Sequence, residues 1–418
     1  MTTTRLFAIA FIWVTSTVAW FILGTSVTSR SGQFDGHLSA EVAKLWGGPQ
    51  RQTAPSAFVV RPVDVTETVQ EPQLDGRSVT RKITRTVSEE FALPLDSSRV
   101  SVDLGLQHRQ KGLLWYDTYT VAFKATYMIT NPDDVDRPIV ARLQFPSNEA
   151  IYDEFSVRLN GVEAPRVSDL ARGVEVRARI PAGGRVPLEV RYMSRGLDEW
   201  SYALAPSGVT QVRDLVVTMT TDFDAVDFPP GTMSPTTMTR TPRGRNIEWK
   251  FSSLVTGQAI GMDLPDRTNP GPLAARITFF APVSLLFFMT VLVILGILSD
   301  ETLHPMNYAF LSAAFFAFHL LLAYMVDHVN THASFVASAA TSIVLVVSYL
   351  RLVAGMRFAV RRAGVAQLVF LVFFSYAFFF EGYTGLTVTI GSIVTLFVLM
   401  QATARVDWST VFRRPVRA

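Results

Sequence analysis

The stretch LFAIAFIWVTSTVAWFILGTSV, Leu6–Val27, indicates to which class of protein this 418-residue chain belongs. It is apolar and long enough to cross a bilayer core about 30 Å thick, which takes about 20 residues of α-helix. The sequence therefore predicts an integral membrane protein. The last third of the chain supplies five further runs of this kind, at Ile277–Leu298, Tyr308–Val326, Ser334–Leu350, Val365–Phe380 and Leu386–Ala402.

The first span is interpreted as an uncleaved anchor, with a cleaved signal peptide as the alternative. Its apolar run is longer than the roughly 7–15 residues of a signal-peptide core, and it contains Trp13 and Trp20. It is followed by Thr25-Ser-Val-Thr28, which lacks the A-x-A pattern of a cleavage site.

The polar region between the first span and the others has the pattern of a β domain. Alternation of apolar and polar residues over Tyr119–Ile129 predicts a strand, and similar short runs follow it, separated by turn residues. Asn160-Gly161 between two such runs predicts a hairpin turn. This spacing favours an antiparallel, sandwich-like fold of one or two domains.

The chain is therefore expected to have a mixed fold. An N-terminal transmembrane anchor helix would precede extracytoplasmic antiparallel β-sandwich-like structure and a C-terminal helical bundle of five spans. The expected boundaries are residues 1–29 for the anchor, 30–275 for the mainly β domain, 276–404 for the bundle and 405–418 for a basic tail.

Arginines near the ends of the spans set the predicted orientation. Basic clusters lie in the loop at Arg351–Arg362 and in the tail at Arg405–Arg417, and both are placed in the cytoplasm by the positive-inside rule. Six spans then put both termini in the cytoplasm and the β domain outside. That domain holds 28 basic and 30 acidic residues, so the high pI belongs to the membrane part and does not indicate nucleic-acid binding.

The amino-acid composition and the motifs of the chain exclude several kinds of catalytic and metal site. The chain has no cysteine, which excludes thiol nucleophiles, disulfides and thiolate metal sites. It contains no phosphate-binding G-x-x-x-x-G-K-[ST] loop, no G-x-S-x-G and no H-E-x-x-H. We therefore expect a non-enzymatic protein, and assign no catalytic residue, cofactor or metal.

Short motifs at both ends resemble the CreD family of bacterial inner-membrane proteins. They are Trp46-Gly-Gly-Pro after the first span, His304-Pro-Met-Asn-Tyr308 at the start of a later span, and Asp327-His328 at its end. Tyr349-Leu-Arg351 and the turn at Glu381 follow in the family's order. The resemblance implies a multi-pass protein of the bacterial inner membrane that is linked to cell-envelope integrity, and it implies no reaction.

Six polar positions of the membrane region are candidates for function. His319 lies inside a span, where an ionisable residue is costly and often functional; the alternative is a neutral imidazole bonded to a neighbouring helix. Asp327, His328 and Glu381 are expected at the outer surface, either as a site or as an ordinary polar rim. His304 and Tyr308 are candidates on the family pattern alone.

The leading hypothesis is a protein whose β domain binds an envelope protein or lipid while the bundle anchors it or relays its state. The alternative is a transporter or lipid-handling protein with an external receptor domain, which predicts that the polar residues of the spans share one interior face. A membrane-bound hydrolase with two carboxylates in an outward cleft ranks third.

Overall fold

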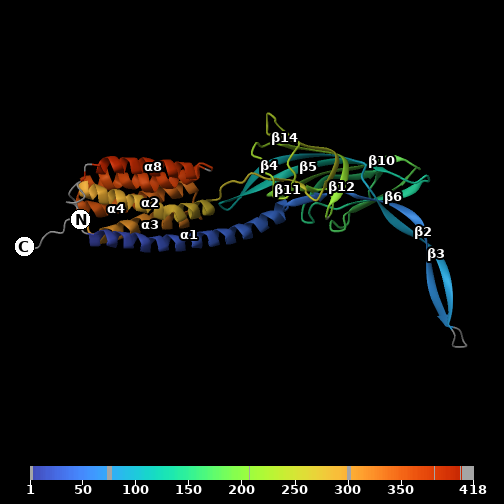
Figure 1. Ribbon diagram of the computed structural model, residues 1–418, viewed down its shortest axis with the longest axis horizontal. Helices are drawn as coiled ribbons and strands as arrows, with labels where there is room; N and C mark the ends of the chain where they lie inside the picture. The colour runs from blue at the N-terminus through green and yellow to red at the C-terminus, as the bar shows by residue number, and fades with distance from the viewer. Residues whose placement is uncertain are drawn as a thin grey trace, which may run out of the picture. The chain divides into compact units, whose positions relative to one another are not determined.

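The computed structural model describes residues 3–72, 78–206, 208–298, 303–380, 382–404 and 406. The chain divides into two compact units. The helical unit comprises Met1–His37, Gly112–Leu114 and Thr268–Ala418, and the β unit comprises Leu38–Lys111 and Trp115–Arg267. The predicted order of an N-terminal apolar helix, a β-rich region and a C-terminal set of apolar helices is confirmed (Figure 1).

The helical unit contains six helices, within the described residues, that are long and apolar enough to cross a membrane. They are α1 (Thr3–Trp46), α2 (Pro270–Leu298), α3 (Pro305–Met325), α4 (Thr331–Ala354), the composite helix Met356–Phe379 and α8 (Thr384–Thr403). The composite helix joins α5 (Met356–Phe358), η1 (Ala359–Gly364), α6 (Val365–Gln367), η2 (Leu368–Phe373), α7 (Phe374–Tyr376) and η3 (Ala377–Phe379), of which η1 and η2 are π-helical.

Local sequence explains where these helices begin and end. The side chain of Asn330 accepts a hydrogen bond from the amide of Ala333 at 3.1 Å and so caps α4. Helix α1 continues past its apolar run and ends at Trp46, as the Gly47-Gly-Pro sequence predicts. Gly47 has φ +101°, and a Cβ atom there would lie 2.3 Å from the carbonyl oxygen of Arg195. This position therefore requires glycine.

Within the residues that the structure describes, the β unit is built from three sheets. The orders are β13-β14-β12-β4-β5-β10-β7-β8, β3-β2-β6-β9 and β1-β11-β15. The strands are β1 (Gln50–Thr53), β2 (Ser56–Pro72), β3 (Ser78–Leu93), β4 (Ser97–Lys111), β5 (Leu114–Thr130), β6 (Arg137–Leu143), β7 (Tyr152–Leu159), β8 (Val162–Glu163), β9 (Val174–Ile180), β10 (Arg185–Leu197), β11 (Glu199–Ala203), β12 (Thr210–Thr221), β13 (Thr237–Arg240), β14 (Arg245–Thr256) and β15 (Ile260–Asp263).

One hydrophobic core joins the three sheets. Alternate residues of β5, including Phe123 and Tyr127, are fully buried and face the core, while the residues between them lie on the other face of the sheet. Phe123 packs against Trp200 of β11, with ring centroids 6.4 Å apart. The hydroxyl groups of Tyr127 and Tyr202 are hydrogen-bonded at 3.0 Å. The eight-stranded sheet therefore has one face in the core and one open face.

The strand pairing refines the predicted antiparallel pattern. Most described ladders are antiparallel, but β1 pairs with β11 and β4 pairs with β12 in parallel. Both pairs join strands that are far apart in the sequence, and parallel neighbours need such long connections. The hairpin at Asn160-Gly161 is confirmed, since both residues have positive φ values, +51° and +79°, as a type I′ turn requires.

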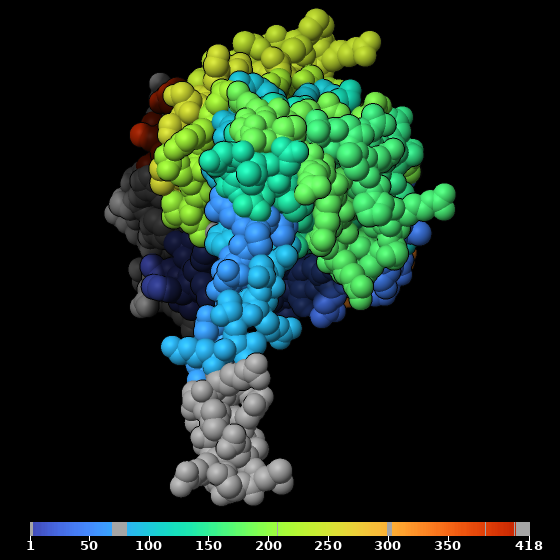
Figure 2. Space-filling model, turned by 90° about the vertical axis from the view of Figure 1, so that its right-hand side faces the viewer, coloured from blue at the N-terminus to red at the C-terminus, as the bar shows by residue number. Residues whose placement is uncertain are grey.

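Strands β2 and β3 extend beyond their sheet as a two-stranded arm (Figures 1 and 2). Only Ser56–Val59 of β2 pairs with β6, whereas β2 pairs with β3 over Ala57–Pro72. On this arm the hydroxyl of Thr86 donates to Asp64 at 2.6 Å, which adds a side-chain link between the strands. Such links matter here because a hairpin without a third strand is only marginally stable in water.

Candidate functional site

His319 is fully buried in the helical unit among aromatic rings. Its Nδ1 atom lies 3.1 Å from the carbonyl oxygen of Phe315, one turn earlier on α3. The rings of Trp20 and Phe318 meet it edge-on, with centroids 5.7 and 4.8 Å away. Among the described residues its Nε2 atom has no hydrogen-bond partner. An Nδ1–H donor to the carbonyl leaves Nε2 as a buried acceptor.

Asp327 forms an ion pair with α1. Its carboxylate lies 2.9 Å from the guanidinium of Arg30, which also donates to the carbonyl oxygen of Ala323 at 2.5 Å. The same guanidinium lies over the ring of Tyr324, 4.6 Å from its centroid. Asp327 therefore ties α1 to the C-terminal end of α3, which is a structural role the sequence does not reveal.

The other predicted positions do not form one site with these residues. His304 is the N-cap of α3, where its Nδ1 atom accepts a hydrogen bond from the Met306 amide at 3.2 Å. Tyr308 is buried one turn later, near the opposite end of α3 from His328. Glu381 lies outside the described residues. No group of three His, Asp or Glu side chains suited to a metal ion occurs in the described ranges.

The polar residues of the spans partly share an interior. Ser312, His319, Ser342, Gln367 and Ser375 are all buried, whereas Thr387 is exposed on α8. Gln367 donates from Nε2 to the Ser342 hydroxyl at 2.8 Å, and that hydroxyl donates to the carbonyl of Ala314 at 2.6 Å. Gln367 also lies between the two π-helical segments. The π-helix is a rare conformation in proteins, and where it does occur it is often at a functional site.

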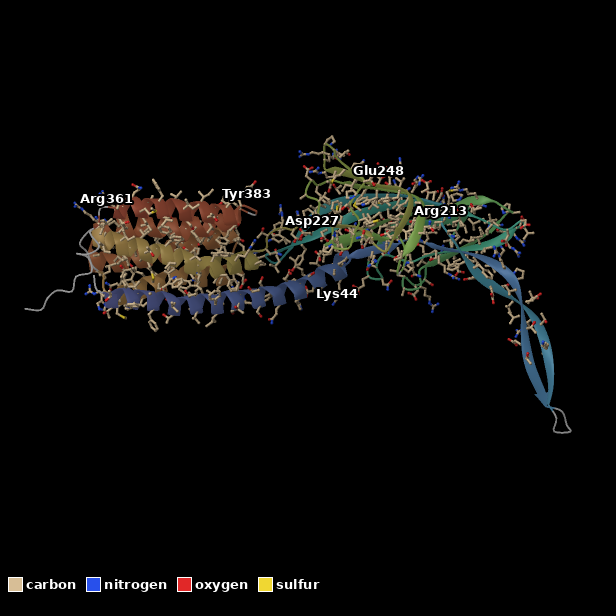
Figure 3. All side chains as sticks on the ribbon, viewed as in Figure 1. Lys44, Arg213, Asp227, Glu248, Arg361 and Tyr383 are labelled. Carbon is tan, nitrogen blue, oxygen red and sulfur yellow. The ribbon has the colours of Figure 1, made fainter. Side chains whose placement is uncertain are left out.

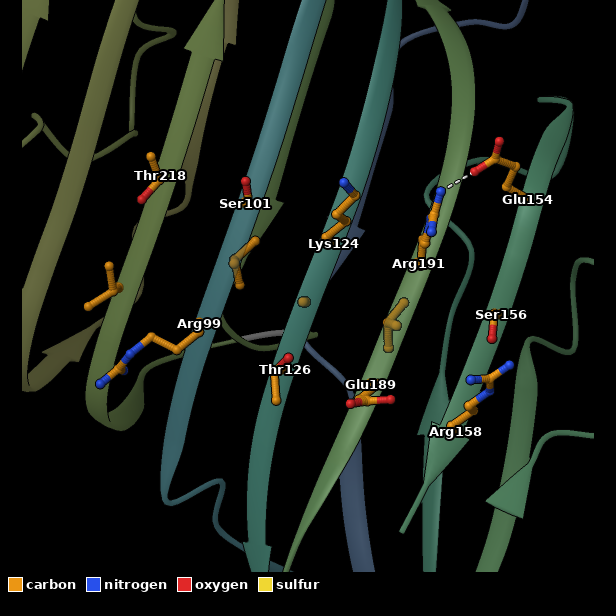
Figure 4. Close-up of a pocket in the computed structure, with 14 residues that line it drawn as sticks. Arg99, Ser101, Lys124, Thr126, Glu154, Ser156, Arg158, Glu189, Arg191 and Thr218 are labelled. Atoms are coloured by element: carbon orange, nitrogen blue, oxygen red, sulfur yellow. Dashed lines mark hydrogen bonds and ion pairs between the residues drawn. The ribbon is translucent and has the colours of Figure 1, made fainter. Parts of the chain in front are cut away.

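The open face of the eight-stranded sheet carries a groove of about 650 Å³, which no local pattern in the sequence revealed (Figure 4). It crosses the five strands β12, β4, β5, β10 and β7, whose outward side chains line it. Four cations and two carboxylates line this groove, namely Arg99, Lys124, Arg158, Arg191, Glu154 and Glu189. Hydroxyl groups lie between them, from Ser101, Thr126, Ser156 and Thr218.

The cations of the groove differ in their partners. Arg99 pairs with Asp214 at 2.7 Å outside the lining, and Arg191 pairs with Glu154 across to β7. Within the ranges that the structure describes, Lys124 and Arg158 have no ion-pair partner. The lining therefore carries a net positive charge, part of which Glu189 offsets. In the sequence, the only signal was the presence of outward charges in several of the strand-like runs.

A second group of titratable residues lies elsewhere in the β unit. His108 Nδ1 is 2.6 Å from the Asp117 carboxylate, and Asp117 is also hydrogen-bonded to Asp266. Burial, this carboxyl–carboxyl hydrogen bond and the nearby charges of Asp266 and Asp198 raise the pKa of Asp117 to about 8. Burial also lowers the pKa of His108. At neutral pH Asp117 is therefore largely protonated, and the imidazole of His108 is neutral.

The comparisons with known proteins agree with the resemblance seen in the sequence. Residues 230–409 match the family model described as inner membrane protein CreD. No curated protein matches the chain. Among solved structures, the chain is similar to a crystal structure of a candidate nutrient binding protein from Legionella pneumophila, at 9% sequence identity and a TM-score of 0.32. That match covers 61% of this chain and 82% of the other. We draw no conclusion about fold or function from a TM-score this low.

Proposed function

Since the resemblance to the CreD inner-membrane family is confirmed over residues 230–409, we propose that this integral membrane protein serves the cell envelope by binding, without catalysis. The β unit lies outside the inner membrane, both termini lie in the cytoplasm, and the open groove holds an envelope component. The helical unit anchors the β unit or relays its state. The arginines of the C-terminal half support this orientation.

The observation that carries the proposal is the groove with its unpaired cations. A sheet face that only contacts water needs charge for solubility, but it has no need to set two cations directly opposite each other on neighbouring strands, as Lys124 and Arg191 are. Lys124 on β5 and Arg158 on β7 are both exposed and unpaired within the described chain, on a rigid sheet whose other face is the core. Such a surface holds a ligand without having to be ordered first.

A transport or lipid-handling function is the second candidate, and the buried polar residues favour it. Gln367 and Ser342 form a hydrogen bond near the middle of their helices, beside two π-helical segments. Irregular helices with polar groups at that depth occur in the substrate sites of transporters. The same bond also serves as a link between helices, which is the commoner use of Ser and Gln in membranes.

Reversing the groove's charge should impair the envelope. In a strain that lacks the gene, a variant with Lys124→Glu and Arg158→Glu should leave detergent sensitivity and periplasmic leakage close to those of the deletion strain, because an anionic partner would be repelled. The measurement is complementation at matched membrane levels.

The matched control reverses two exposed arginines that do not line the groove, Arg179→Glu on β9 and Arg213→Glu on β12 (Figure 3 labels Arg213). This variant should restore the barrier as wild type does. Full restoration by the groove variant would contradict the proposal. Loss of the barrier with Gln367→Leu, when the groove variant restores it, would favour transport instead.

A further inference from the structure

Two cations of the groove stand directly opposite each other on neighbouring strands. Lys124 of β5 is the register partner of Arg191 of β10. Directly opposed side chains of an antiparallel pair have Cβ atoms about 4.5–5.5 Å apart, and like charges at that separation are destabilising. Arg191 turns toward Glu154 on β7, which leaves Lys124 facing the groove. The sheet maintains an unfavourable pair that an anion between the two strands would relieve.

The neighbouring row of the sheet carries charges of both signs. Arg158 is the register partner of Glu189, and Glu189 is the partner of Thr126. Arg158 therefore lies on the strand beyond β10, opposite Glu189 on one side and Glu163 of β8 on the other, although among the described residues it forms an ion pair with neither. The farther part of the same sheet face has the opposite character, because Asp103 and Asp222 line a second hollow there. The opposed cations Lys124 and Arg191 therefore mark one defined position on this sheet face.

The rest of the lining matches hydroxylated ligands. Ser101, Thr126 and Thr218 offer hydroxyls that both donate and accept, and Glu189 offers acceptors for the hydroxyls of a sugar. The described lining residues include no aromatic ring on which a base could stack, which argues against a nucleic acid strand. A volume of about 650 Å³ is in the range of small-ligand sites.

We infer that the groove binds a phosphate-bearing saccharide, with the phosphate between Lys124 and Arg191 and the sugar along the hydroxyl row. This inference rests on the proposed function and names its ligand. A phosphate group is the anion that fits best, because its several oxygens can accept from an ammonium and a guanidinium on adjacent strands at once. The saccharide is either part of a membrane glycolipid or a free sugar phosphate.

The test uses the full-length protein in nanodiscs of zwitterionic lipid. The probes are lipopolysaccharide, the same lipopolysaccharide after chemical removal of its phosphates, glucose 1-phosphate, glucose and inorganic phosphate. We expect binding of lipopolysaccharide, of glucose 1-phosphate or of both, at least tenfold weaker binding after loss of the phosphate, and weaker binding of phosphate alone than of the complete ligand. Affinity should fall as salt is raised, since exposed cations are screened.

The variants Lys124→Gln and Arg158→Gln should together weaken binding at least tenfold, whereas Arg179→Gln should leave it unchanged. Neither groove substitution removes buried surface, and the thermal midpoint shows whether each variant is folded. Equal binding of phosphorylated and dephosphorylated probes would overturn the inference, and so would an affinity that is the same in the groove variants as in the wild type. If no probe binds but the charge-reversed protein still fails to restore the envelope barrier, the ligand class is wrong and the proposed function stands.

Discussion

Replacing Trp200 with alanine should strongly destabilise the β unit. Trp200 is fully buried on β11, the central strand of the three-stranded sheet, and its ring lies 6.4 Å from that of Phe123 in the eight-stranded sheet. Removing a buried Trp from a packed core costs about 3–5 kcal/mol. Because a domain is usually stable by only about 5–15 kcal/mol, this is a large part of the total.

The measurement is chemical denaturation of the purified full-length protein in detergent, followed by the β signal in circular dichroism. Met238→Ala is the matched control, because Met238 is 46% exposed on β13 and its loss should change the free energy of unfolding by less than about 0.5 kcal/mol. A Trp200→Ala protein with the wild-type denaturation midpoint would show that the sheets do not share this core.

The second large effect is the pH dependence that Asp117 gives to the free energy of unfolding. Its carboxyl group has a pKa of about 8 in the folded protein, against an ordinary value of 3.8, chiefly because it is buried and hydrogen-bonded to Asp266. Between these values the folded chain holds a proton that the unfolded chain releases. The free energy of unfolding must therefore fall as pH rises from about 4 to 8, since stability falls with pH wherever the folded state binds more protons.

Asp117→Asn should remove most of this fall. The amide stays neutral at every pH, its oxygen can accept from His108, and its NH₂ group can donate to Asp266. We expect thermal midpoints of the variant to exceed those of the wild type near pH 8 and to converge with them near pH 4. Parallel curves for the two proteins across this range would show that Asp117 does not hold the proton.

The membrane-spanning helices were largely predictable from the sequence, because the requirement for each one is met within a single continuous stretch of chain. A helix in lipid must present about 20 apolar residues, so each span is visible in its own stretch of chain. The strand over Tyr119–Ile129 and the turn at Asn160-Gly161 were predictable for the same reason, since alternation and positive φ are properties of neighbouring residues.

The groove was not predictable, because it depends on register between distant strands. Lys124 and Arg191 face each other only because β5 pairs with β10 in one particular register, and a shift by one residue would move either side chain to the other face. The parallel pairing of β4 with β12 brings Thr218 to the same surface from far along the chain. The ion pair of Arg30 with Asp327 likewise required knowing that α1 packs along α3.

Photo-crosslinking in living cells can show whether the open groove of the β unit holds an envelope component. A photoreactive amino acid replaces Thr126 in the groove and, in a second strain, Arg179 on β9. We predict an adduct at position 126 that disappears when Lys124→Glu and Arg158→Glu are added, with none at position 179. An adduct at 179 alone, or one at 126 that survives the charge reversal, would contradict binding in the groove.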